Sequence, residues 1–207
     1  MTKTDTEMSP VNPGAQAREV LVIKLSALGD FVLALGAMKA VREMHLSARI
    51  TLLTTPFFEE FGKLCPYVDR VETDGRPEGM KATAALIQRI RKTDYDIVYD
   101  FQTSGRTRNY FTALNRSGKA PLWSGHHEKA AFFHDNAERG RMHSIDRLAE
   151  QLEVAGVAPQ AGRHAAPAAG LFRADPALYA VDTWRLGAPR GQALAGSELC
   201  RTGDADC

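Results

Sequence analysis

The sequence has few cysteines, and they have neither the spacing of a zinc site nor that of a disulfide framework. Its three cysteines are Cys65, Cys200 and Cys207. Zinc sites need closely spaced pairs of Cys or His ligands, and small disulfide-stabilised domains need an even set of cysteines. We therefore expect a chain that folds on its hydrophobic core in a reducing compartment, the cytoplasm.

The sequence also lacks a long apolar run and an excess of one charge. Its longest apolar stretch, residues 31–38, is far shorter than the roughly 20 residues that span a bilayer, so any membrane contact is expected to be peripheral. Residues 1–18 are polar and lack the apolar core of a signal peptide, which predicts a disordered leader. Lys and Arg total 26 against 25 Asp and Glu, a net charge of +1, which argues against a nucleic-acid partner.

Several motifs of cofactor and nucleophile chemistry are missing. The chain has no three-glycine dinucleotide fingerprint, no Gly-Lys-Ser/Thr phosphate loop and no Gly-x-Ser-x-Gly elbow. No cofactor is therefore expected. A small-molecule nucleotide-binding domain remains an alternative, which tight binding of a free dinucleotide would favour.

What is present is a regular alternation of strand and helix patterns from residue 19 onward. Strands are predicted at 20–24, 49–54, 70–72, 96–101 and 121–123, and helices at 31–44, 56–64, 81–92, 106–114 and 143–154. Such alternation predicts an α/β fold: a Rossmann-like parallel sheet with helices on both faces and right-handed crossovers. Residues 19–157 are expected to form this domain. Residues 158–207 are rich in Ala, Gly and Pro, and are expected to be a tail without a packed core.

The junction between the first strand and helix, residues 24–30, is the strongest candidate for a site. Gly29 allows close backbone approach by a ligand, and the free amides of a helix start favour an anion or a polar oxygen. Ser26 and Asp30 flank it. An Asp or Ser at this place also has a plain structural explanation as a helix cap, which stabilises by about 1 kcal/mol. The pattern alone does not decide between a ligand-binding site and a cap.

Further polar residues follow the predicted strand at 96–101. Asp100 and Gln102 are expected at the same sheet edge as Asp30, because the carboxyl ends of parallel strands converge on one cleft. An ordinary loop hydrogen bond explains Asp100 nearly as well, so Gln102 is the better candidate. The basic residues that follow, Arg106, Arg108, Arg116 and Lys119, suit the phosphates of an anionic glycolipid or are simply solvated surface charge.

Three groups of acidic or histidine residues raise the alternative of a metal site. They are Asp94-x-Asp96, Asp204-x-Asp206, and the group of His126, His127, Glu128, His134 and Asp135. The first begins a strand and is expected at the edge opposite the cleft, the second lies in the tail, and the third lacks recognised ligand spacing. No metal is expected.

Residues 19–157 resemble the N-terminal half of glycosyltransferase family 9, which includes the lipopolysaccharide heptosyltransferases. The resemblance lies in the order and spacing of several pieces. These are the Ser26-Ala-Leu-Gly-Asp30 turn with its helix through Ala40-Val41-Arg42, the strand at 48–54, Tyr95-Asp-Ile-Val-Tyr-Asp-Phe-Gln102, and His143-Ser-Ile-Asp-Arg147 opening a helix.

The resemblance implies a GT-B architecture, in which two Rossmann-like halves face each other across a cleft. It implies inverting transfer of a sugar, heptose above all, from a nucleotide-activated donor such as ADP-heptose to a lipid-linked oligosaccharide at the cytoplasmic face of the inner membrane. Asp30 is then the general base toward the acceptor hydroxyl, with Ser26, Gly29, Asp100 and Gln102 binding the acceptor.

The tail does not match the donor-binding half of the family, whether through truncation, frameshift or divergence. The chain is therefore expected to supply the acceptor half and to have negligible transferase activity alone, because catalysis needs both substrates positioned together. The alternative is a non-catalytic remnant that binds an anionic glycan or a partner.

Overall fold

The computed structural model describes residues 14, 16–75, 79–116 and 120–157. The tail at 158–207 and almost all of the leader at 1–18 lie outside the described residues. The structure therefore does not test the predictions of a disordered leader and of a tail without a packed core.

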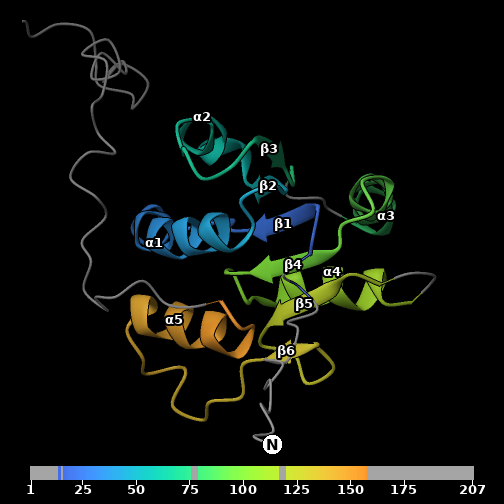
Figure 1. Ribbon diagram of the computed structural model, residues 1–207. Coiled ribbons are helices and arrows are strands. Elements are labelled where there is room, and N and C mark those ends of the chain that lie inside the picture. The colour runs from blue at the N-terminus through green and yellow to red at the C-terminus, as the bar shows by residue number, and fades with distance from the viewer. Residues whose placement is uncertain (1–13, 15, 76–78, 117–119, 158–207) are drawn as a thin grey trace, which may run out of the picture. The chain divides into compact units, whose positions relative to one another are not determined.

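Six parallel strands form one sheet in the order β3-β2-β1-β4-β5-β6 (Figure 1). The strands are β1 (Glu19–Ile23), β2 (Arg49–Thr54), β3 (Arg70–Thr73), β4 (Ile97–Asp100), β5 (Leu122–Gly125) and β6 (Phe132–Phe133). In β1, Ile23 is in register with Leu53 of β2 on one side and with Asp100 of β4 on the other. The predicted Rossmann-like parallel sheet is confirmed.

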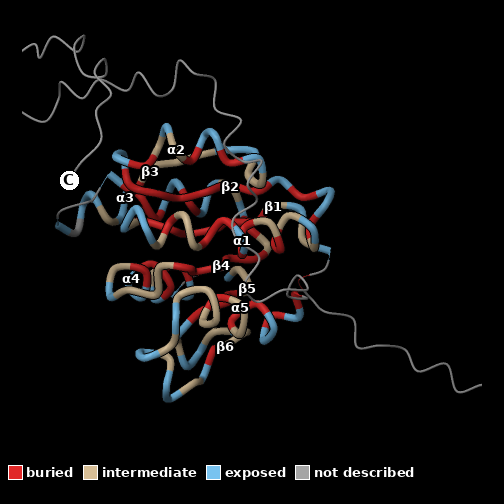
Figure 2. The backbone as a smooth tube through the Cα atoms, turned by 90° about the vertical axis from the view of Figure 1, so that its left-hand side faces the viewer, coloured by how far each residue is buried: buried red, intermediate tan, exposed pale blue. Residues whose placement is uncertain are grey.

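The central strands are buried on both faces, which explains why β1 and β4 read as continuous apolar runs (Figure 2). Alternate residues of β1 enter two separate cores. Val20 and Val22 belong to one hydrophobic cluster, and Leu21 and Ile23 belong to the other.

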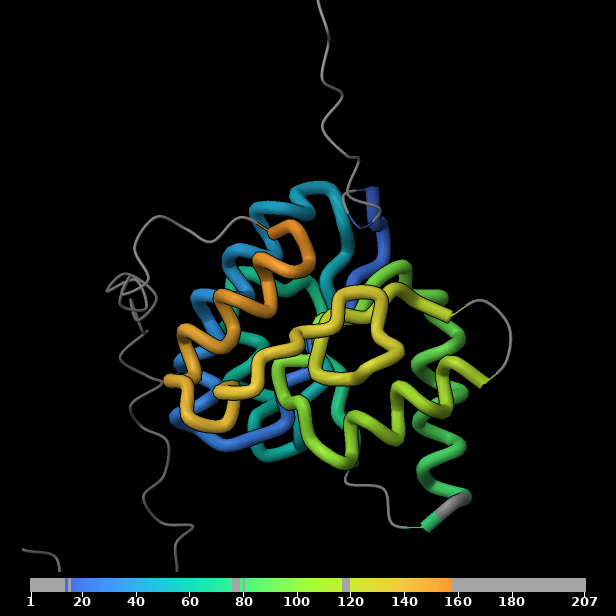
Figure 3. The backbone as a smooth tube through the Cα atoms, turned by 90° about the horizontal axis from the view of Figure 1, so that it is seen from below, coloured from blue at the N-terminus to red at the C-terminus, as the bar shows by residue number. Residues whose placement is uncertain are grey.

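One helix layer covers each face of the sheet (Figure 3). The first layer contains α1 (Leu28–Met44), the 3₁₀ turn η1 (Pro56–Phe58), α2 (Glu59–Lys63) and α5 (Ser144–Val154). The second contains α3 (Gly79–Lys92) and α4 (Gly105–Leu114). None of the described helices is both long and apolar enough to cross a membrane.

The predicted elements match the observed ones closely, and two of the differences lie near the candidate site. α1 begins at Leu28, so the turn residues Gly29 and Asp30 lie inside its first turn. The loop predicted around residues 126–135 contains β6, whose Phe132 and Phe133 pair with Ser124 and Gly125. A two-residue strand is too short to show periodicity, so the sequence carried no signal for it.

The strand order places a switch point between β1 and β4. From β1 the chain runs into α1 on one face, whereas from β4 it runs into α4 on the other. In open α/β sheets, ligands bind in the crevice outside the carboxyl ends of the strands at such a point. This edge is where the candidate site residues follow their strands.

Candidate functional site

Asp30 lies in the first turn of α1, at the switch-point edge. The N-cap of this helix is Ala27, and no side chain makes a capping hydrogen bond there. Instead, Oδ1 of Asp30 accepts a hydrogen bond from Oγ of Ser144 over 3.1 Å. The explanation of Asp30 as a helix cap is therefore wrong, and its half-buried carboxylate is held at the edge by a residue of α5.

Helix α5 brings Ser144 to Asp30 because it packs alongside α1 (Figure 3). Its N-cap is His143, whose Nδ1 accepts from the amide of Ile145, so Ser144 is the first helical residue. Arg147, one turn later, donates through Nη2 to Oγ of Ser144 over 3.3 Å. Sequence reasoning noted this helix start but did not assign Ser144 or Arg147 to the site, since nothing local links them to a residue 114 positions earlier.

Gln102 fixes the turn that precedes Asp30. Its Oε1 accepts hydrogen bonds from the amides of Leu25 and Ser26, over 2.9 and 3.0 Å. The Ser26–Ala27 peptide bond in this turn is cis. The structure thus brings Ser26 and Gln102 together and gives Gln102 a turn-supporting contact, while acceptor binding by either residue stays a prediction.

Gly29 sits on the exposed side of this turn. A Cβ built on it would meet no atom within 4 Å apart from its chain neighbours and the backbone of its own helix, so the backbone here is open to approach by a ligand. Its predicted part in acceptor binding therefore fits the space available.

Asp100 is buried at the end of β4 and faces the protein interior. Its Oδ1 accepts from the amides of Gln102 and Thr103, over 3.1 and 2.8 Å. Burial raises its pKa to about 6, against the opposing effect of these hydrogen bonds. These contacts fit the explanation of Asp100 as a loop-supporting residue, and acceptor binding by Asp100 stays a prediction.

Three cations lie close to Asp30 and Asp100, and each bonds a neutral acceptor. Nζ of Lys24, at the end of β1, donates to the carbonyl of Phe101 over 3.4 Å. Arg139 donates to Oγ1 of Thr103 and Nδ1 of His134, and Arg147 donates to Ser144.

The charges of these cations act on one another. Burial lowers the pKa of Lys24, and so does the charge of Arg147, while Asp30 and Asp100 raise it. Burial likewise lowers the pKa of Arg139 to about 10, with Arg147 acting in the same direction. Within the described ranges, none of the three cations forms an ion pair, so the edge beside Asp30 keeps positive charge that suits an anionic ligand.

The basic residues predicted as a cluster after β4 lie in different surroundings in the structure. Nη1 of Arg106 forms an ion pair of 2.7 Å with Oδ2 of the buried Asp74, at the end of β3. Arg108 and Arg116 are exposed, and Lys119 lies outside the described residues.

The groups considered as metal ligands have other contacts. Oδ2 of Asp96 accepts from the amides of Arg18 and Glu19, over 2.8 and 3.1 Å, at the amino end of the sheet. His134 is buried and contacts Glu150 and Arg139. In the part of the chain that the structure describes, no group of three or more His, Cys, Asp or Glu is arranged to hold a metal ion; Asp204 and Asp206 lie outside it.

Solved structures of glycosyltransferase family 9 share this fold. The family 9 enzyme from Veillonella parvula aligns over 68% of this chain and 42% of its own, with 20% identity and a TM-score of 0.58. The E. coli heptosyltransferase WaaC, solved with ADP-2-deoxy-2-fluoro heptose, aligns over 68% of this chain and 49% of its own, with 16% identity and a TM-score of 0.51. E. coli heptosyltransferase II aligns over 69% and 44%, with 15% identity and a TM-score of 0.52. The predicted resemblance in fold is confirmed.

Sequence comparison points the same way over a shorter stretch. A Haemophilus influenzae protein provisionally named a glycosyltransferase is 25% identical over 83 residues, which are 40% of this chain and 24% of that protein. No protein-family profile matches the chain. The chain thus spans about a quarter of its curated relative and less than half of each solved structure.

Proposed function

We propose that this chain carries the acceptor-binding domain of a glycosyltransferase that transfers a sugar from a nucleotide-activated donor to a lipid-linked oligosaccharide. The observation that supports this most directly is the place of Asp30: in the first turn of α1, at the switch-point edge, with no capping role. Heptose carried by ADP is the donor we favour, because two of the similar structures are heptosyltransferases and one was solved with an ADP-heptose analogue.

In the proposed reaction, Asp30 acts as the general base. The acceptor hydroxyl attacks the anomeric carbon of the donor and forms the new glycosidic bond. The bond from that carbon to the phosphate oxygen breaks with inversion, the nucleoside diphosphate leaves with the electron pair, and the hydroxyl proton passes to the Asp30 carboxylate. For this transfer, the hydroxyl must come within roughly 2.6 to 3.2 Å of the carboxylate.

The surroundings of Asp30 suit the acceptor side of such a reaction. Gly29 leaves open space next to the carboxylate, and Gln102 holds the turn in shape. Lys24, Arg139 and Arg147 supply positive charge that favours a glycan bearing phosphate or carboxylate groups. The donor is proposed to bind to a second domain that the described residues do not form. The reaction is proposed to take place at the cytoplasmic face of the inner membrane.

The first experiment measures acceptor binding by the full chain. Titration calorimetry with a lipid-linked core oligosaccharide is expected to show binding, whereas mixing the chain with ADP-heptose and acceptor is expected to yield negligible product by mass spectrometry. Acceptor binding without sugar transfer, both by the chain alone and by the fusion described below, would favour the alternative of a non-catalytic glycan-binding domain. Sugar transfer by the purified chain alone would contradict the assignment to the acceptor side only.

The second experiment tests the base. Residues 1–157 are fused to the part of E. coli WaaC that this chain does not match, and turnover is compared with and without Asp30→Asn. General base catalysis contributes about 10²- to 10⁴-fold, so kcat is expected to fall by that range while KM for the acceptor changes little. Asp146→Asn is the matched control, because Asp146 holds the equivalent place in the first turn of α5. Near-normal turnover of the Asp30→Asn fusion would rule out the base role.

A further inference from the structure

The two helix layers of the domain carry opposite charge. The layer of α3 and α4, including Arg116 just after α4, contains seven basic residues and no acidic one: Lys81, Arg89, Arg91, Lys92, Arg106, Arg108 and Arg116. The helices of the other layer contain seven acidic residues (Asp30, Glu43, Glu59, Glu60, Asp146, Glu150 and Glu153) and four basic ones (Lys39, Arg42, Lys63 and Arg147). The net charge of +1 therefore conceals a strongly polarised domain.

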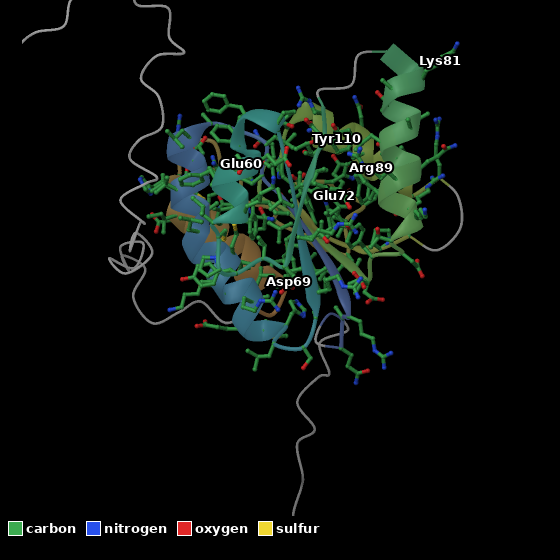
Figure 4. All side chains as sticks on the ribbon, turned by 90° about the horizontal axis from the view of Figure 1, so that it is seen from above. Glu60, Asp69, Glu72, Lys81, Arg89 and Tyr110 are labelled. Atoms are coloured by element: carbon green, nitrogen blue, oxygen red, sulfur yellow. The ribbon has the colours of Figure 1, made fainter. Side chains whose placement is uncertain are left out.

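Most of the positive charge on α3 and α4 is exposed and unpaired. Arg89 forms an ion pair with Glu72, and Arg106 forms one with Asp74. The other five basic residues are all exposed, and none forms an ion pair with a carboxylate in the described ranges. Figure 4 shows Lys81 at the start of α3 pointing away from the domain, whereas Arg89 lies toward Glu72.

A shallow groove runs between the two helices, with a volume of about 690 Å³. Small and apolar side chains, including Ala84, Ile87 and Ala113, line it together with Arg91 and Arg116. Nη2 of Arg91 also donates to the carbonyl of Ala113 over 2.5 Å, which fixes the guanidinium beside the groove. Cations beside a weakly apolar groove match the phosphate and glycerol region of a phospholipid.

We propose that the face formed by α3 and α4 binds the surface of a membrane that contains anionic phospholipids. Basic residues on an amphipathic helix are attracted to such surfaces, and α3 buries Leu86, Ile87 and Ile90 while exposing its cations. A nucleic acid fits less well, because the aromatic residues of these helices, Tyr110 and Phe111, are buried and cannot stack on bases. This proposal extends the proposed function, whose acceptor is attached to a lipid.

The test is co-sedimentation of the full chain with vesicles that contain no acceptor. Vesicles of phosphatidylcholine alone are compared with vesicles of equal parts phosphatidylcholine and phosphatidylglycerol, at low and at physiological salt. The chain is expected to bind only the anionic vesicles, and less at higher salt. The triple variant Lys81→Glu, Lys92→Glu, Arg108→Glu is expected to weaken this binding by about a hundredfold or more.

The matched control is the triple variant Lys39→Glu, Lys63→Glu, Arg141→Glu, which changes the net charge equally but lies outside α3 and α4. It is expected to bind within about threefold of the parent, with circular dichroism confirming that both variants are folded. An equal loss in both variants would overturn the proposal, since net charge and not this face would then drive binding. Failure of the parent to bind anionic vesicles, or tighter binding to duplex DNA that the first variant abolishes, would also overturn it.

Because the vesicles carry no acceptor, this result is separate from that of the proposed function. If the chain does not bind vesicles, the membrane proposal fails, but the results for acceptor binding and sugar transfer are unaffected. Conversely, vesicle binding by a chain that binds no acceptor leaves the membrane face in place and rejects the sugar-transfer assignment.

Discussion

The hydroxyl of Ser144 donates a hydrogen bond of 3.1 Å to the carboxylate of Asp30 and so ties the first turn of α5 to the first turn of α1. Arg147 bonds the same hydroxyl. The proposed base is therefore positioned by a neighbouring helix on the other side of the switch point. The predictions below test this contact and the turn, the strand end and the packing around it.

Ser144→Ala is expected to lower the free energy of unfolding by about 1 kcal/mol, because a half-buried hydrogen bond to a carboxylate is lost. A double-mutant cycle with Asp30→Ala, measured by urea denaturation, should give a coupling energy of about the same size. Ser144→Ala combined with Glu60→Ala serves as control, since distant sites are additive within about 0.5 kcal/mol. Simple additivity of the Ser144 and Asp30 changes would show that their contact contributes nothing.

Gln102→Ala is expected to cost about 2 kcal/mol of stability, because the amides of Leu25 and Ser26 lose their shared acceptor. Gln102→Glu keeps an acceptor oxygen at the same distance along the side chain, so its cost should be less than half as large. Guanidinium denaturation followed by circular dichroism measures both. Equal losses in the two variants would mean that the amide oxygen is not what supports the turn.

Asp100→Asn is expected to remove a specific pH dependence of stability. Burial raises the pKa of Asp100 from 3.8 to about 6, so between these pH values the native state holds a proton that the unfolded chain has released. Its contribution to the free energy of unfolding therefore falls as pH rises through this window, by about 3 kcal/mol in all.

Asn cannot titrate, but its Oδ1 still accepts from the amides of Gln102 and Thr103. The stability of Asp100→Asn relative to the parent should therefore increase from pH 4 to about pH 6 and level off toward pH 7 in urea denaturation. A stability difference that stays constant over this pH range contradicts the raised pKa.

Gly125→Ala is expected to destabilise the domain by about 1 to 3 kcal/mol through overpacking. A Cβ at this position would lie 3.0 Å from Nε1 of Trp123 and 3.2 Å from Cβ of Asp100. Gly36→Ala is the control, because Gly36 is exposed in the middle of α1 with nothing within 4 Å of its Cβ. That change should stabilise by about 0.5 to 1 kcal/mol, and thermal denaturation distinguishes the two signs.

Much of the fold follows from local pattern. Phe31, Leu35, Met38 and Val41 recur at helical spacing within the predicted helix at 31–44, and all four are buried. Gly156 follows the predicted helix at 143–154, and it has a positive φ of 72° while the amide of Val157 donates to the carbonyl of Leu152, as at many helix ends. Helical spacing and a glycine stop are properties of neighbouring residues, so they can be read directly from the sequence.

The contacts of the candidate site, by contrast, join residues that are far apart in the sequence. The bond from Ser144 to Asp30 and the bonds from Leu25 and Ser26 to Gln102 join residues that are between 76 and 114 positions apart. No local pattern specifies which atom of a polar side chain will face the cleft and which will support the backbone. The sequence therefore predicted that Asp30, Asp100 and Gln102 follow strands at one edge of the sheet, but left open whether Asp100 binds a ligand or supports the loop.

The link between α1 and α5 also has a consequence for how the domain is made. Asp30 is synthesised 114 residues before Ser144, and at about 5 to 20 residues per second the ribosome needs roughly 6 to 23 s to cover that distance. During this interval the first βα unit is present without the helix that holds its carboxylate. The edge beside Asp30 is thus completed only when nearly the whole described domain has left the ribosome.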